Sequence, residues 1–138
     1  MVFRTWLFII VLPGLSGCSL FDSGTEWKSG SFEVLWIDLT SDSHLAYRLS
    51  ETTSIQIVGS CVFAAGANAE YVVAKQRPNG TLATNFYVVP IKKYSPSADT
   101  RKIVIGPLSE SEYREYGKEN DLPILTDVLP ESVCNEKV

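Results

Sequence analysis

Short apolar runs rich in aromatic and β-branched residues alternate with turn residues along most of this chain of 138 residues. The clearest run, Phe32–Leu39, is bounded by Gly30-Ser31 and by the polar cluster Thr40–Ser43. Repeated short runs of this kind indicate an antiparallel β fold. We therefore predict a mainly β (α+β) domain, a small antiparallel sheet, sandwich or barrel with one C-terminal helix. Further strands are expected at Ala46–Leu49, Ser54–Val58, Cys61–Ala65, Tyr71–Lys75, Phe86–Ile91 and Lys102–Ile105.

Turn residues indicate how the central strands are connected. Pro78-Asn79-Gly80 is typical of a tight turn, because proline fixes φ and Asn-Gly tolerates positive φ. Gly66 or Asn68 supplies the same freedom at an earlier turn. We expect Ser54–Ile91 to form an antiparallel meander of about four strands.

One helix near the C-terminus is marked by its capping residues. Ser109 and Glu112 have the spacing of a capping box, and Leu108 and Tyr113 have the spacing of the accompanying hydrophobic staple. The helix is predicted to cover residues 110–118. We expect it to pack on the sheet through its tyrosine face.

One of the predicted strands is apolar on both of its faces. Alternation places Tyr87 and Val89 on one side and Phe86 and Val88 on the other. One face must belong to the core, and the other is either a second layer or a binding surface. Pro90 cannot donate to a ladder, which places the strand at an edge of the sheet or ends it at a bulge. An edge strand there could pair with a strand of another protein.

The N-terminus has the plan of a secretory signal peptide. Arg4 supplies a positive charge, and the apolar run Trp6–Leu12 is well short of the roughly 20 residues that span a bilayer. Leu15-Ser16-Gly17-Cys18 follows, with small residues directly before the cysteine. This stretch resembles the lipobox of bacterial lipoproteins, a resemblance confined to the first 18 residues. It implies that Cys18 is acylated and becomes the first mature residue; the alternative is an ordinary secretory signal that happens to carry a cysteine.

The resemblance to lipoproteins also implies a location. Two or three acyl chains such as palmitate on one cysteine hold a protein stably on a membrane. In this class an aspartate after the cysteine favours the inner membrane, whereas Ser19 occupies that position here. We therefore expect an anchor in the outer membrane with the domain facing the periplasm. The predicted organisation is a signal peptide over 1–17, a lipidated tether over 18–31 and a single β-rich domain over 32–138.

Cys61 and Cys134 remain as an even pair once Cys18 is acylated. In an oxidising compartment such a pair favours a disulfide. The alternative is a buried free thiol at Cys61 and a frayed C-terminal end. Two separated cysteines and a single histidine lack the spacing of a zinc site.

The polar residues offer little catalytic chemistry. His44 is the only histidine, so any serine or cysteine mechanism that uses an imidazole must involve it, yet its polar surroundings are typical of an exposed loop. Asp38 interrupts a strand and could be a buried acid paired with Glu33 or Glu51, but Glu33 points to the opposite face. The simpler interpretation of Asp38 is a residue that ends the strand and caps the next turn. Asp38, Asp42 and His44 lack the spacing of a calcium loop. We expect no enzyme and no cofactor or metal site.

Composition and plan together indicate a binding protein. Nucleic acid is excluded as a partner, because 12 basic residues face 16 acidic ones, the net charge is −4, and no basic block is present. Aromatic residues lie beside basic ones along the chain, with Trp27, Trp36, Tyr47, Tyr71, Phe86, Tyr87 and Tyr94 near Lys75, Arg77, Lys92 and Lys93. These aromatic residues either fill the core or form a binding surface. A lipobox, a short tether and a small acidic β domain resemble the plan of bacterial inhibitor and immunity lipoproteins. That resemblance implies a non-catalytic domain that binds an envelope protein, an incoming toxin or a hydrolase. The alternatives are a structural subunit of an envelope assembly or secretion machine, and a small envelope hydrolase.

Overall fold

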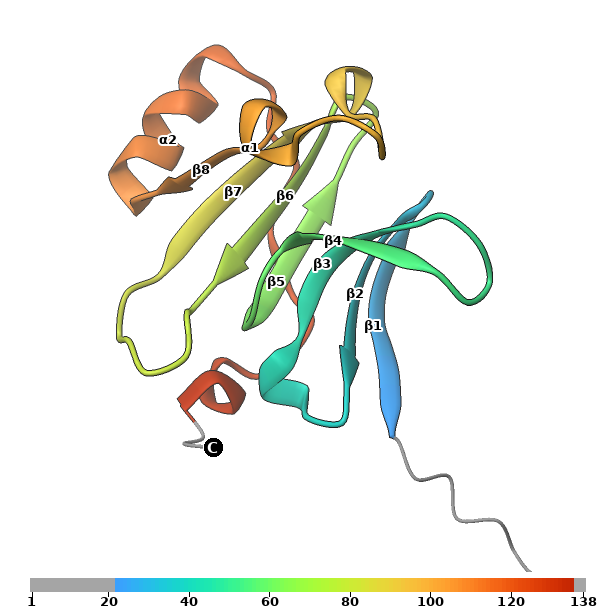
Figure 1. The fold of residues 1–138 in the computed structure, drawn as a ribbon. Helices are drawn as coiled ribbons and strands as arrows, with labels where there is room; N and C mark the ends of the chain where they lie inside the picture. The colour runs from blue at the N-terminus through green and yellow to red at the C-terminus, as the bar shows by residue number, and fades with distance from the viewer. Residues whose placement is uncertain (1–21, 136–138) are drawn as a thin grey trace, which may run out of the picture.

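The computed structural model describes residues 22–135, which form two antiparallel sheets packed on one core (Figure 1). The predicted mainly β fold class is confirmed, and the arrangement is sandwich-like. Sheet A has the order β1 (Ser23–Ser29), β2 (Phe32–Ile37), β3 (His44–Arg48), β4 (Ser54–Val58). Sheet B has the order β8 (Ile105–Leu108), β7 (Asn85–Pro90), β6 (Tyr71–Gln76), β5 (Val62–Ala67), β9 (Thr126–Asp127). The helices are α1 (Thr100–Ile103) and α2 (Glu110–Glu119), with short 3-10 helices η1 (Thr40–Asp42), η2 (Ile91–Lys93) and η3 (Glu131–Asn135).

The main core lies between the two sheets. Val34 and Leu45 project from sheet A and meet Val72 and Val89 from sheet B, and all four side chains are fully buried. Burial of one such aliphatic side chain contributes about 1.5–3 kcal/mol. The inward positions of the strands therefore supply the main stabilisation of the sandwich.

Sheet B is also buried on its other face. Phe86 and Val88 are removed from water there, and the ring of Phe86 stacks on Tyr113 of α2 at a centroid distance of 4.8 Å. The C-terminal segment lies so close to β5 that a Cβ at Gly66 would collide with the carbonyl oxygen of Ile124. In Figure 1, α2 lies over β7 and β8. The second apolar face of β7 is therefore covered by a second layer and is not a binding surface.

β7 is an interior strand, so the edge position predicted from Pro90 is wrong. It pairs with β6 along its whole length and with β8 at Phe86 and Val88. Pro90 is the last residue of β7 and lies beyond the part that β8 pairs with. Its missing N–H therefore costs no ladder hydrogen bond on that side. The strand of another protein has no free edge at Phe86 and Val88 to pair with.

The predicted meander has three strands, because β4 belongs to sheet A while β5, β6 and β7 lie in sheet B. Gly66 lies inside β5, and neither Gly66 nor Asn68 has the positive φ that we expected at this turn. The side chain of Asn68 shapes that turn, because its Oδ1 accepts the N–H groups of Glu70 and Tyr71 at 2.9 and 2.8 Å. Gly80 has a φ of +77° in the later turn, as its sequence predicted.

Residues 23–29 form strand β1, so the tether predicted over 18–31 is wrong for this part. β1 pairs with β2 and has an irregularity around Glu26. Trp27 packs against the core, and Nε1 of Trp36 donates to Oε1 of Glu26 at 2.7 Å. These contacts outweigh the weak strand propensity of a segment that contains glycine and serine.

The strand predicted at Lys102–Ile105 begins three residues later. Thr100–Ile103 form the short helix α1, because the side chain of Asp99 accepts the N–H of Arg101 at 3.1 Å and caps the first turn. β8 then starts at Ile105. A local cap thus overrides the strand propensity of the isoleucine and valine side chains.

Helix α2 begins where its capping box predicts. The backbone N–H of Ser109 donates to Oε2 of Glu112 at 2.7 Å, and the N–H of Glu112 donates to Oγ of Ser109 at 3.2 Å. The hydrogen bond from the Ser109 backbone holds the pKa of the Glu112 carboxyl below its usual value. At the other end, Asn120 donates to the carbonyl of Tyr116 at 2.9 Å. The helix is therefore held at both ends by its own side chains.

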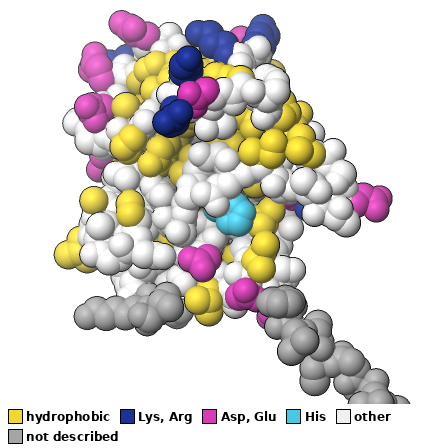
Figure 2. All heavy atoms as spheres, in the orientation of Figure 1, with side chains coloured by type: hydrophobic (Ala, Val, Ile, Leu, Met, Phe, Trp, Pro, Cys, Tyr) yellow, Lys and Arg dark blue, Asp and Glu magenta, His cyan; other side chains and the backbone are white. Residues whose placement is uncertain are grey.

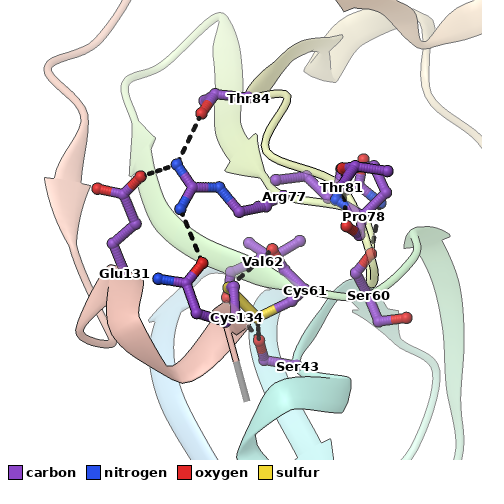
Figure 3. Close-up of a disulfide and its surroundings, with 12 residues drawn as sticks. Ser43, Ser60, Cys61, Val62, Arg77, Pro78, Thr81, Thr84, Glu131 and Cys134 are labelled. Atoms are coloured by element: carbon purple, nitrogen blue, oxygen red, sulfur yellow. Dashed lines mark hydrogen bonds and ion pairs between the residues drawn. A yellow bond between two sulfur atoms is a disulfide. The ribbon is translucent and has the colours of Figure 1, made fainter. Parts of the chain in front are cut away.

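A disulfide joins Cys61 and Cys134, which are 73 residues apart, in agreement with the pairing expected from the sequence (Figure 3). Both cysteines are buried in a small cluster beneath the C-terminal segment. Arg77 adds an ion pair with Glu131 and a hydrogen bond of 3.1 Å to Asn135. The C-terminal layer is therefore fixed to sheet B by a covalent bond and by charge.

Replacing Cys61 and Cys134 together by alanine is expected to destabilise the fold by about 4 kcal/mol, because the unfolded chain regains the entropy of a long loop. Urea unfolding of the oxidised wild type and the double variant measures the difference. The reduced wild type is the matched control and should unfold near the urea concentration of the variant. Equal midpoints for the oxidised and reduced wild type would show that the bridge does not stabilise the fold.

Candidate functional site

The candidate acids and histidine of the sequence do not form a catalytic group. Asp38 follows the end of β2 with a φ of +67°, is exposed, and gives η1 no side-chain cap. His44 is the first residue of β3, half-buried, so its placement in an exposed loop was wrong. Its Nδ1 contacts the backbone carbonyl of Asp42 at 3.1 Å. Cys18, the predicted lipidation site, lies outside the described residues.

Glu33 is the buried acid of the structure. Its side chain is 1% exposed on the outer face of sheet A. Oε2 accepts from Nη2 and Nε of Arg48 at 2.6 and 3.0 Å, and Oε1 accepts the hydroxyl of Ser54 at 2.7 Å. Arg48 also donates to the carbonyl of Glu51 at 2.9 Å, which folds the β3–β4 loop over the pair. Both carboxylate oxygens of Glu33 are therefore occupied, and the group acts as a structural ion pair.

A groove of about 460 Å³ runs beside this ion pair. Its lining includes Trp36, His44, Arg48 and the loop residues 51–54. The cation in it is already neutralised by Glu33, and the carboxylate of Glu51 is a further charged group in the lining. Within residues 22–135 no three side chains of the metal-binding types gather into a possible metal site.

A second pocket, of about 270 Å³, has three aromatic residues in its wall. The rings of Phe32, Tyr47 and Tyr94 form a triangle with centroid distances of 5.1 to 5.4 Å. Ile91 and the β1–β2 turn at residues 29–31 complete the wall. We call this space the aromatic pocket. Phe32 is buried, whereas Tyr47 and Tyr94 are only half-buried and remain accessible from the surface.

Tyr94, which lines the aromatic pocket, has a buried hydroxyl. Its hydroxyl oxygen is buried and has no hydrogen-bond partner within the part of the chain that the structure describes. Burial, and then the nearby phenol of Tyr47, raise the pKa of Tyr94 above its ordinary value. The phenol ring of Tyr94 therefore forms the wall of the pocket, while its protonated hydroxyl is enclosed behind the wall.

Basic side chains lie at the same end of the molecule. Lys92 and Lys93 are exposed on η2, directly between the pocket residues Ile91 and Tyr94. Lys102 is exposed on α1, and none of these three lysines forms an ion pair with another described residue. Figure 2 shows Lys and Arg side chains toward the upper end of the molecule, with Asp and Glu side chains among them. We call this surface, with the aromatic pocket, the basic end.

The sequence indicated the composition of the basic end but not its location. Tyr47 and Tyr94 were expected either in the core or on a binding surface. In the structure both pack against the core and both line the aromatic pocket. The adjacent Lys92-Lys93 and Tyr94 were the available signal. The contact with Phe32 and the β1–β2 turn depends on tertiary packing. The ion pair of Glu33 was missed for the same reason, since its partners come from two other strands.

The comparisons with known proteins leave the site to be interpreted from its own chemistry. No family model, no curated protein and no solved structure matches this chain. Among the described helices, none has both the length and the apolar character needed to cross a bilayer.

Replacing Arg48 by methionine is expected to destabilise the fold by about 3 kcal/mol, because the buried carboxylate of Glu33 loses its counter-ion. The double variant Arg48→Met/Glu33→Leu should recover most of that loss, since it removes both charges. Urea unfolding of the three proteins tests this coupling. Additive losses in the double variant would contradict a direct interaction between the two side chains.

Tyr94→Phe is expected to leave stability at pH 7 unchanged or slightly higher, since the hydroxyl that it removes has no partner. The raised pKa gives the wild type a share of stability that is present below pH 10 and is lost as the pH rises through the folded-state pKa. The variant should therefore lose less stability between pH 9 and about pH 11. Urea unfolding across this range measures the difference, and a large loss at pH 7 would show that the hydroxyl is bonded.

Proposed function

We propose that this protein is a lipid-anchored envelope protein whose sandwich binds another protein without catalysing a reaction. Acylation of Cys18 would hold it on the outer membrane, facing the periplasm. Its most specific role would be that of an inhibitor or immunity protein. The observation that carries the proposal is the basic end, where an open pocket with three aromatic rings in its wall lies beside lysines that pair with no other described residue.

The position of the basic end supports this role. β1 starts at Ser23, next to the first described residue, and its seven residues lead to the turn that lines the aromatic pocket. Seven extended residues cover about 23 Å. In Figure 1 the chain enters at the lower end of β1, and the β1–β2 turn and η2 lie at the upper end. An anchor just before Asp22 would therefore leave the basic end facing away from the membrane.

The chemistry of the basic end indicates what kind of partner it fits. Aromatic side chains around a small pocket are typical of the few residues that dominate a protein interface. Unpaired lysines at the rim attract an acidic surface and raise the rate of association. The expected partner surface is thus acidic and inserts one side chain into the aromatic pocket. Covering the active site of a hydrolase in this way needs no catalytic residue on this chain.

A structural subunit of an envelope assembly is the second candidate, and the free edge of β4 favours it. β4 has the residues Ser54-Ile55-Gln56-Ile57-Val58 and pairs only with β3. It contains no charged residue and no proline, whereas β1 carries Glu26 and Lys28, β8 carries Pro107, and β9 has two residues. Uncharged edge strands of this kind are suited to pairing with another chain.

Co-purification from the native cells tests both candidates. The double variant Lys92→Glu/Lys93→Glu is expected to recover at least tenfold less partner than the wild type, because it reverses the charge of the rim. Arg114→Glu/Lys118→Glu on the exposed surface of α2 makes the same change of charge and is the matched control. Mass spectrometry of the co-purified proteins gives the measurement.

The outcomes separate the candidates. Loss of one partner from the lysine variant alone supports the inhibitor, whereas loss from both variants contradicts a role of the basic end. Gln56→Lys places a charge on the free edge of β4. If only this variant loses several subunits of one assembly, the structural role replaces the inhibitor. Mass spectrometry of the N-terminal peptide tests the anchor, and an unmodified Cys18 would contradict it.

A further inference from the structure

Two exposed apolar side chains lie beside the first described residue. Ile37 is 52% exposed at the end of β2, and Leu39 is 44% exposed just before η1. Asp38 lies between them with a φ of +67°, which makes a sharp corner of the backbone. We call residues 37–39 the β2–η1 corner. Isolated apolar side chains on a surface are common, so the position of these two decides whether they have a role.

Hydrogen bonds hold the β2–η1 corner against the start of the described chain. The N–H of Asp38 donates to the carbonyl of Asp22 at 2.7 Å, and Ser23 pairs with Ile37 in the ladder. The N–H of Leu39 donates to the carbonyl of Ile37 at 2.8 Å, which fixes the corner itself. The chain therefore enters the domain directly beside Ile37 and Leu39.

The short distance along the chain from Cys18 sets a limit on where the corner can lie. Four residue steps separate Cys18 from Asp22, and four extended residues span at most about 14 Å. A lipid on Cys18 would thus keep the corner within that distance of its attachment point. We propose that Ile37 and Leu39 contact the bilayer that holds Cys18 and orient the domain with its basic end away from the membrane. This inference rests on the proposed lipid anchor.

The charges at the corner determine which bilayer surface it fits. Asp22, Asp38 and Asp42 lie around the two apolar side chains and are exposed. Carboxylates are repelled by anionic lipids, so the contact is with zwitterionic headgroups. Two side chains bury too little area to bind a membrane from solution. Attachment through Cys18 supplies the high local concentration that makes the contact form.

Paramagnetic broadening of methyl signals tests the contact on the mature chain from Cys18 to Val138. The thiol of Cys18 is coupled to a maleimide lipid in phosphatidylcholine nanodiscs that also contain a spin-labelled lipid. Ile124 and Leu49 are 86% and 50% exposed and provide internal controls of the same residue types. Leu49 lies at the other end of the domain, because the N–H of the preceding Arg48 donates to the carbonyl of Ser31 in the β1–β2 turn. The methyl signals of Ile37 and Leu39 are expected to broaden at least threefold more than those of the controls.

Equal or weaker broadening at Ile37 and Leu39 would overturn the inference. The variant Ile37→Ser/Leu39→Ser changes only exposed side chains and should remain folded, as its circular dichroism would show. This variant is coupled to the lipid through Cys18 in the same way. The difference in broadening between signals near Asp22 and signals near Ile124 should then fall by at least half. An unchanged difference would also overturn the inference. Because the lipid is attached chemically, these results do not depend on whether cells acylate Cys18. An unmodified Cys18 in cells would instead overturn the proposed anchor.

Discussion

Val72 and Val89 on one face of sheet B and Phe86 and Val88 on the other are all removed from water, so this sheet needs a covering layer on each side. Sheet A supplies one layer, and α2 with the C-terminal segment supplies the other. A chain of this size buries only the apolar surface of a single small domain. The disulfide between Cys61 and Cys134 therefore adds a covalent link that holds the second layer on sheet B.

This three-layer arrangement leaves few surfaces free for binding. Both faces of sheet B are occupied, and the outer face of sheet A is partly closed by the ion pair of Glu33 with Arg48. The open surfaces of the described residues include the two ends of the sandwich, the edge of β4, the groove beside the ion pair and a hollow along α2. The ends differ in character, since one carries aromatic rings and lysines and the other carries apolar residues among aspartates. A protein anchored at one end and bound at the other would use both.

The features that could be predicted from the sequence are those that depend on neighbouring residues. The capping box at Ser109, the positive φ of Gly80 and the strand that contains Val88 each follow from a few adjacent residues. Tertiary contacts decided the rest. β1 forms because Trp27 reaches the core, although its glycine and serine residues indicate a flexible segment. Pro90 ends β7 inside the sheet because β8 does not extend that far. The aromatic pocket combines residues from three separate segments.

Photo-crosslinking in the native cells tests the central claim, that the two ends of the sandwich contact different partners. A photoreactive amino acid is placed in turn at Lys92, at Leu39 and at Ile124, all of which are exposed. The account predicts a protein adduct from position 92, a lipid adduct from position 39, and neither from position 124. A protein adduct from position 39 or 124 with none from position 92 would contradict it.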